Sequence, residues 1–113
     1  MQYMALIYST PGSEATYDGD MMADYMQFAK DATEAGVMVA GDALNPVTDA
    51  SSVRVRNGKT VVTDGPFAET KEVLGGYYLL ECADLDQALH WAARIPTAKQ
   101  GTVEVRPIMV FDM

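Results

Sequence analysis

A stretch near the N-terminus, Tyr3–Tyr8, is apolar on both sides when it is read as a β-strand. Successive side chains of a strand point to opposite faces. The two faces therefore carry Tyr3, Ala5 and Ile7 on one side and Met4, Leu6 and Tyr8 on the other. A strand of this kind needs an apolar neighbour on each face, because a large exposed apolar surface is rare in a stable monomer. This pattern favours an arrangement in which both faces of the sheet are covered.

Two segments have apolar residues at helical spacing. The first begins at Asp18 or Asp20, which caps it, and runs to about Ala35, with Gly36 as its C-terminal stop. Its expected buried face consists of Met22, Tyr25, Met26, Ala29 and Ala32. The second begins at Asp84, with Gln87 at the spacing of a capping box, and ends at Pro96. Its apolar stripe is Leu85, Ala88, Leu89, Ala92 and Ile95.

A hairpin is predicted around Asn57-Gly58, because both residues tolerate the positive φ of a two-residue turn. Its strands are Val53–Arg56 and Thr60–Val62. The turn pairs Val55 with Thr60 and Val53 with Val62 on one face. The other face, with Arg54, Arg56 and Lys59, is expected to be solvated.

Further strands are expected at Val37–Ala40, Gly75–Cys82 and Thr102–Phe111. The resulting order is βαββαβ with an inserted β-hairpin, which predicts a ferredoxin-like α+β fold with both helices on one face of an antiparallel sheet. The opposite face would remain apolar and bare. A second copy packed sheet to sheet, giving a dimeric α+β barrel, is the simplest cover. We therefore predict a homodimer.

Composition limits the classes of function. The chain has 113 residues, which suits one domain over 1–113, and its net charge of −8 disfavours direct nucleic-acid binding. No apolar run approaches the ~20 residues of a membrane span. The N-terminus lacks the pattern of a signal peptide, and the single Cys82 excludes an intrachain disulfide, so we expect a cytoplasmic protein without membrane contact. One histidine and one cysteine cannot form a structural zinc site, and no dinucleotide or phosphate-binding fingerprint is present. No cofactor or metal is expected.

Residues 64–72, DGPFAETKE, are followed by GGYY at 75–78. This run resembles the signature of the DGPF proteins, a branch of the YCII-related family. Ala35-Gly36-Val37, residues 53–56 and residues 103–107 add to the resemblance. It implies a dimeric α+β barrel with a cleft in each subunit between sheet and helices. The wider superfamily includes cofactor-free isomerases, dehydrochlorinases and monooxygenases that act on ring compounds. Some DGPF members are encoded beside extracytoplasmic-function sigma factors, which implies a regulatory link.

One departure from the family limits what can be transferred. The YCII-like branch with proposed catalysis uses a histidine on the first helix, paired with an aspartate. The predicted helix at 20–35 contains no histidine. That acid–base pair is therefore not expected here.

Two carboxylates are the candidate catalytic groups. Asp64 opens the Gly-Pro turn, where its carboxylate either accepts backbone N–H bonds in an Asx turn or stands at the mouth of a cleft as an acid, base or ligand acceptor. Glu72 ends a charged run that is either a solvated surface segment or turns inward. Four further residues are candidates for binding a ligand or a developing negative charge: Lys71, Arg106, Tyr8 and Phe67. For Arg106, a structural ion pair with Glu104 is the alternative.

Two functions remain open from the sequence. The first is a cofactor-free enzyme that performs acid–base chemistry, of isomerase or lyase type, on a small organic molecule in a cleft near Asp64. The second is a non-catalytic dimer that binds a ligand or a regulatory protein, such as a sigma factor. A catalytic carboxylate should lie in a concave, partly apolar pocket, whereas a turn-capping Asp64 need not.

Overall fold

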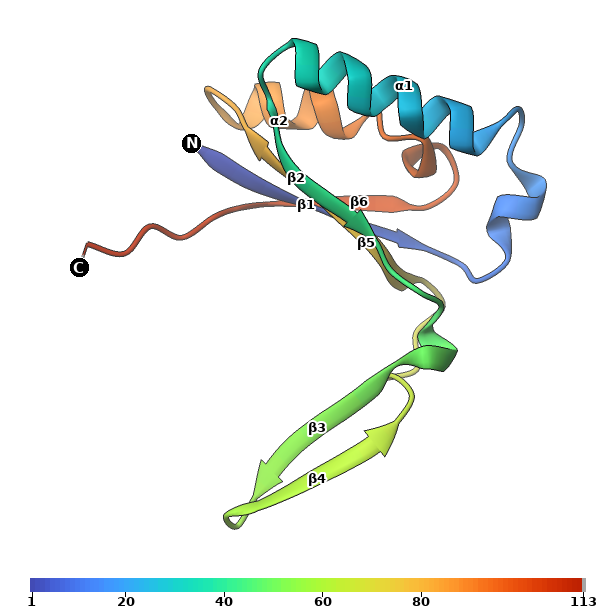
Figure 1. The fold of residues 1–113 in the computed structure, drawn as a ribbon, viewed down its shortest axis with the longest axis vertical. Coiled ribbons are helices and arrows are strands. Elements are labelled where there is room, and N and C mark those ends of the chain that lie inside the picture. The colour runs from blue at the N-terminus through green and yellow to red at the C-terminus, as the bar shows by residue number, and fades with distance from the viewer. Residues whose placement is uncertain (113) are drawn as a thin grey trace.

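A computed structural model describes residues 1–112 and shows a four-stranded sheet, two α-helices and a separate hairpin (Figure 1). The strands are β1 (Gln2–Ser9), β2 (Met38–Ala43), β3 (Ser51–Arg56), β4 (Lys59–Asp64), β5 (Val73–Glu81) and β6 (Thr102–Pro107). The helices are α1 (Met21–Glu34) and α2 (Leu85–Ala92), with short 3-10 turns η1 (Ser13–Thr16), η2 (Val47–Asp49) and η3 (Pro96–Lys99).

The sheet has the order β2-β5-β1-β6, and every neighbouring pair is antiparallel. This is the order of a ferredoxin-like fold once the β3–β4 hairpin is set aside as an insertion between β2 and β5. The predicted α+β fold is therefore confirmed. The last strand ends at Pro107, earlier than expected, because proline has no N–H for the ladder; one further backbone bond joins Ile108 N–H to the carbonyl of Gln2.

Both helices begin at aspartate caps. The Asp20 carboxylate accepts a hydrogen bond from the Ala23 N–H, and Asp84 accepts one from Gln87. The Gln87 side chain in turn accepts from the Ala83 N–H at 2.6 Å, close to the expected box. The two helices lie on the same side of the sheet (Figure 1). Between them and the sheet lies the core, with Leu80 and Ile95 as its largest fully buried side chains.

The predicted buried face of α1 was partly wrong. Met22 and Met26 are 71% and 66% exposed, whereas Phe28, absent from the prediction, is buried. The Phe28 ring packs between the rings of Tyr78 and Trp91, with centroid distances of 5.0 and 6.2 Å. An aromatic ring removes more apolar area from water than a flexible methionine, so α1 turns Phe28 toward the sheet.

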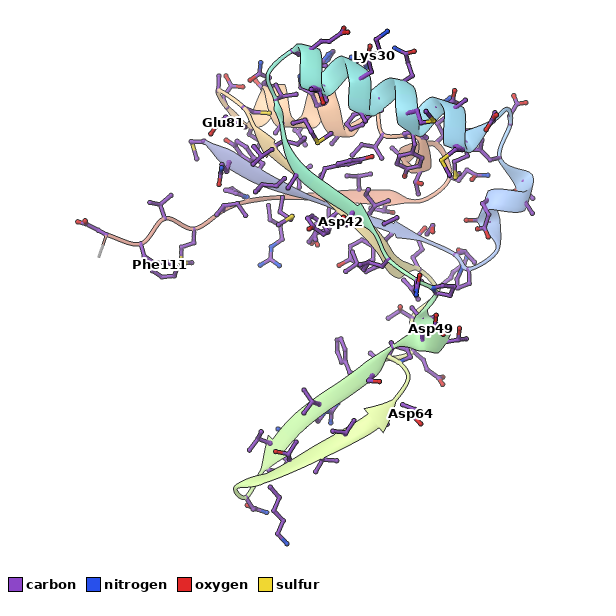
Figure 2. All side chains as sticks on the ribbon, in the orientation of Figure 1. Lys30, Asp42, Asp49, Asp64, Glu81 and Phe111 are labelled. Carbon is purple, nitrogen blue, oxygen red and sulfur yellow. The ribbon has the colours of Figure 1, made fainter. Side chains whose placement is uncertain are left out.

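The β3–β4 hairpin projects from the body on the side of the sheet away from the helices (Figure 1). Its register is the predicted one, with Val53 opposite Val62 and Val55 opposite Thr60, and Asn57 and Gly58 both adopt positive φ. Figure 2 shows its side chains standing clear of the rest of the chain. The radius of gyration is 16.1 Å, larger than the ~13 Å typical of a compact domain of about 100 residues.

The face of the sheet without helices is apolar at its centre, as the sequence predicted. Met4 lies opposite Leu79, and Leu6 lies opposite Tyr77, so these four side chains share that face. All four are only partly buried. We call this surface the bare sheet face. The homodimer that would cover it stays a prediction.

Candidate functional site

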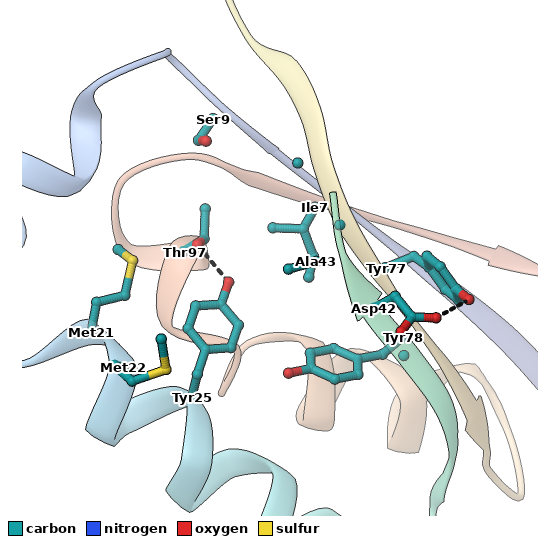
Figure 3. A pocket seen from close by; sticks show the side chains of 13 residues that line it. Ile7, Ser9, Met21, Met22, Tyr25, Asp42, Ala43, Tyr77, Tyr78 and Thr97 are labelled. Carbon is teal, nitrogen blue, oxygen red and sulfur yellow. Dashed lines mark hydrogen bonds between the residues drawn. The ribbon is translucent and has the colours of Figure 1, made fainter. Parts of the chain in front are cut away.

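A cavity of about 450 Å³ lies between the first half of α1, η3 and the helix-facing side of the sheet (Figure 3). This volume is within the range of pockets that hold small molecules. The surface of the cavity wall is mainly apolar, and five of its six polar side chains carry a hydroxyl group. The lining residues are Ile7, Ser9, Met21, Met22, Tyr25, Gly41, Asp42, Ala43, Gly75, Gly76, Tyr77, Tyr78 and Thr97.

Glycines in neighbouring strands allow close contacts beside the cavity. Gly41 of β2 lies opposite Tyr78 of β5, and a Cβ atom at Gly41 would overlap the Tyr78 ring. The Tyr78 ring therefore occupies the space that a side chain at position 41 would fill. A Cβ at Gly76 would lie 3.0 Å from the Asp42 carbonyl oxygen, so a larger residue there would require a small shift of the β2 backbone.

A hydrogen bond between Tyr25 and Thr97 forms the polar part of the cavity wall. The two hydroxyl oxygens are 2.6 Å apart, and Figure 3 shows the bond between α1 and η3. Burial raises the pKa of Tyr25, and burial together with the nearby Tyr25 raises the pKa of Tyr78. Both phenols therefore keep their protons at neutral pH and can donate hydrogen bonds to a ligand oxygen.

A second tyrosine hydroxyl, that of Tyr77, contacts a carboxylate on the other side of β2. The Tyr77 hydroxyl donates to Asp42 Oδ2 at 2.9 Å, and Figure 3 shows this pair pointing away from Tyr25. The bond to the Asp42 carboxylate raises the pKa of Tyr77, because the protonated phenol is the donor. Asp42, the one carboxylate among the described lining residues, thus forms its hydrogen bond outside the cavity.

Asp64 and Phe67 do not line the cavity. Asp64 is the last residue of β4 and is exposed, and Phe67, in the following loop, is 78% exposed. The turn is held by Gly65 N–H to the Ala50 carbonyl and by Ser52 Oγ to the Gly65 carbonyl. Within residues 1–112 the Asp64 carboxylate accepts no hydrogen bond, so the proposed Asx turn is not formed.

The structure brings Glu72 and Tyr8 to the same end of the sheet. Glu72 Oε1 accepts a hydrogen bond from the Thr102 hydroxyl at 2.8 Å, and Thr102 is the partner of Tyr8 across β6 and β1. Arg106 is exposed and lies opposite Met4, on the bare sheet face, and no ion pair joins it to Glu104 in the described chain. Lys71 is exposed beside Glu72. None of these four residues lines the cavity, and catalytic or binding roles for all six candidates stay predictions.

Sequence reasoning did not assign Tyr25 or Thr97 to a site. Tyr25 was placed on the buried face of the first helix, where its hydroxyl needs a partner. That requirement was a usable signal for a polar contact in the cavity. Thr97 lies 72 positions away, directly after Pro96, and no local pattern points to it.

Between residues 1 and 112, no three histidine, cysteine, aspartate or glutamate side chains lie close enough to bind a metal ion together. No helix in this range has the length and apolar character required to cross a membrane.

The structure is that of an α+β protein with a cavity between the helices and the sheet. The chain belongs to the YCII-related domain family, whose model matches residues 1–112. It is 38% identical over 117 residues to an uncharacterised protein, R00369, of Rhizobium meliloti (strain 1021), covering 98% of this chain and 94% of that protein. The match is to the wider family, and the DGPF branch stays a prediction.

A solved structure has a similar fold at low sequence identity. It is 5-chloro-2-hydroxyhydroquinone dehydrochlorinase from Burkholderia phenoliruptrix AC1100, in complex with 2,5-dihydroxybenzoquinone. The TM-score is 0.58 with 13% identity, covering 96% of this chain and 94% of the dehydrochlorinase. At this identity the likeness supports the fold alone.

Proposed function

We propose that the protein binds a small ring compound with a hydroxyl or keto oxygen in the cavity between α1 and the sheet. The observation that carries the proposal is the hydroxyl pair of Tyr25 and Thr97 in the wall of a mainly apolar cavity of about 450 Å³. Apolar walls favour the ring, and a few placed polar groups orient it. The quinone bound to the similarly folded dehydrochlorinase belongs to the same chemical class.

The groups that line the cavity suit binding and polarisation of an oxygen atom. Protonated Tyr25 and Tyr78 donate hydrogen bonds, which stabilise negative charge that develops on a keto or phenolic oxygen. The structure of the single chain therefore supports ligand binding in the cavity better than it supports acid–base catalysis near Asp64. An isomerase- or lyase-like reaction remains our second candidate, because the dehydrochlorinase with this fold is an enzyme.

Calorimetric titration with 2,5-dihydroxybenzoquinone tests the proposal. We expect binding to the wild-type protein, and several-fold weaker binding to Tyr25→Phe, because one hydrogen bond is worth about 1 kcal/mol. Tyr17→Phe is the matched control. The Tyr17 hydroxyl contacts Asp24 on the outside of α1, so its loss should leave the affinity unchanged. Absence of binding to quinones, hydroquinones and catechols alike would remove the proposal.

We also propose a homodimer in which a second copy covers the bare sheet face. The half-buried side chains of Met4, Leu6, Tyr77 and Leu79 support it, since a contiguous apolar surface indicates a partner. The buried, unpaired thiol of Cys82 suits a reducing compartment, and we propose the cytoplasm. A sigma factor as partner stays a prediction from the family resemblance alone.

A further inference from the structure

The hydroxyl of Tyr78 is a polar group of the cavity wall that the rest of the described chain leaves free. Tyr78 is half-buried and lines the cavity, and its hydroxyl forms no hydrogen bond within residues 1–112. Every buried side-chain nitrogen or oxygen atom of these residues has a hydrogen-bond partner. The Tyr78 oxygen, which has none, is therefore not enclosed by protein atoms and is accessible to a molecule in the cavity.

Packing holds the Tyr78 ring in place. Its centroid lies 5.0 Å from that of Phe28 and 6.5 Å from that of Tyr25, both on α1. On the side of β2, the ring fills the space that the missing Cβ of Gly41 leaves open. A hydroxyl on a ring that is held from two sides is presented at a fixed place, as a contact that selects a ligand requires.

The hydroxyls of Tyr25 and Thr97 form a second polar point of the wall. Each hydroxyl has one hydrogen to donate and two lone pairs, so the pair keeps one unused hydrogen whichever oxygen donates the bond between them. The pair is therefore able to bond one oxygen of a ligand. Figure 3 shows the Tyr25 hydroxyl directed toward Thr97 and the Tyr78 hydroxyl directed toward α1, so the two polar points lie at different places in the wall.

We infer that Tyr78 selects rings that carry a second oxygen substituent. One ligand oxygen bonds the pair of Tyr25 and Thr97, and another, on a different ring carbon, bonds the Tyr78 hydroxyl. The inference rests on the proposed function and narrows its ligand to dioxygenated rings, the benzenediols and their quinones. A ring with one oxygen satisfies one point and leaves the other hydroxyl unpaired beside an apolar ligand, which is how a hydrogen-bonding site rejects an analogue.

Titration calorimetry with phenol and the three benzenediols, catechol, resorcinol and hydroquinone, tests this selection. We expect at least one benzenediol to bind the wild type roughly fivefold more tightly than phenol, the effect of one added hydrogen bond. Tyr78→Phe should bind that benzenediol no more tightly than phenol. Tyr17→Phe is the matched control and should keep the preference, because the Tyr17 hydroxyl contacts Asp24 on the outside of α1.

Nuclear magnetic resonance of the wild-type chain gives a second readout that requires no variant to fold. With tyrosine labelled by carbon-13 at Cζ, the preferred benzenediol should shift the signals of both Tyr25 and Tyr78. Circular dichroism checks the fold of Tyr78→Phe, which loses no hydrogen bond of the described residues. A Tyr78 signal that none of the three benzenediols moves overturns the inference.

The outcomes separate the role of Tyr78 from ring binding itself. If the wild type binds phenol and all three benzenediols equally, or if a folded Tyr78→Phe keeps the preference, Tyr78 does not select the second oxygen. Ring binding in the cavity then still stands. A wild type that binds neither benzenediols nor quinones overturns the proposed function, and the inference falls with it.

Discussion

At the scale of single residues, burial determines how the cavity tyrosines respond to pH. The pKa of Tyr25 and of Tyr78 lies above the ordinary 10.0, chiefly because burial disfavours the charged phenolate. Below pH 10 the folded and the unfolded chain both keep these protons, so the two phenols add no pH dependence to the free energy of unfolding. Above pH 10 the unfolded chain releases protons that the folded chain retains. The free energy of unfolding should therefore fall as pH rises beyond 10.

Substitution of Tyr25 by phenylalanine tests this account. At pH 7 we expect Tyr25→Phe to lower the free energy of unfolding by about 1–2 kcal/mol, because the buried Thr97 hydroxyl loses its partner. Above pH 10 the free energy of unfolding of this variant should fall less steeply than that of the wild type, because the variant lacks one of the two phenols that keep their protons in the folded chain. Urea denaturation between pH 7 and 11 measures both effects. The Thr97→Val variant keeps the Tyr25 phenol, so its free energy of unfolding should still fall steeply above pH 10. A fall as shallow as that of Tyr25→Phe would show that the pH dependence does not come from Tyr25.

At the scale of elements, the capping of α2 makes a local and separable contribution. Asp84 accepts a hydrogen bond from the Gln87 N–H at 2.9 Å, whereas Asp86 is an acid in the same first turn without a capping bond. We expect Asp84→Ala to lower the free energy of unfolding by about 1 kcal/mol. Asp86→Ala should lose only the smaller interaction with the helix dipole. The midpoints of urea denaturation compare the two variants. Equal losses of stability would show that negative charge, and not the capping hydrogen bond, stabilises the N-terminus of α2.

The positions of the helices and strands were largely predictable from the sequence. Which side chains of each element face the core, and where the cavity lies, were not. The capping box at Asp84 and the turn at Asn57-Gly58 depend on neighbouring residues, so local chemistry specifies them. The orientation of α1 depends on how Phe28 packs against rings from two other elements, which helical spacing alone does not contain. The bond between Tyr25 and Thr97 forms only after α1 and η3 have packed together. Candidates such as Asp64 were chosen by motif, and a motif does not specify where its loop lies.

At the scale of the whole molecule, the bare sheet face is an apolar surface that a single chain leaves uncovered. An association equilibrium that involves only folded chains makes thermal stability depend on protein concentration. We therefore expect the unfolding temperature of the wild type to rise with concentration across the micromolar range. Leu79→Glu places a charge at the centre of the bare sheet face, opposite Met4, and should abolish that dependence by dissociating the dimer.

The matched control for this substitution is Leu89→Glu, on α2 at the other side of the molecule. Leu89 is already 47% exposed, so the same charge there meets water and should leave the dimer intact. Differential scanning calorimetry at several concentrations, with light scattering for mass, distinguishes the two variants. If Leu89→Glu dissociates the dimer while Leu79→Glu does not, the helices form the interface. The sheet would then be exposed in the assembly, and the barrel would have to be abandoned.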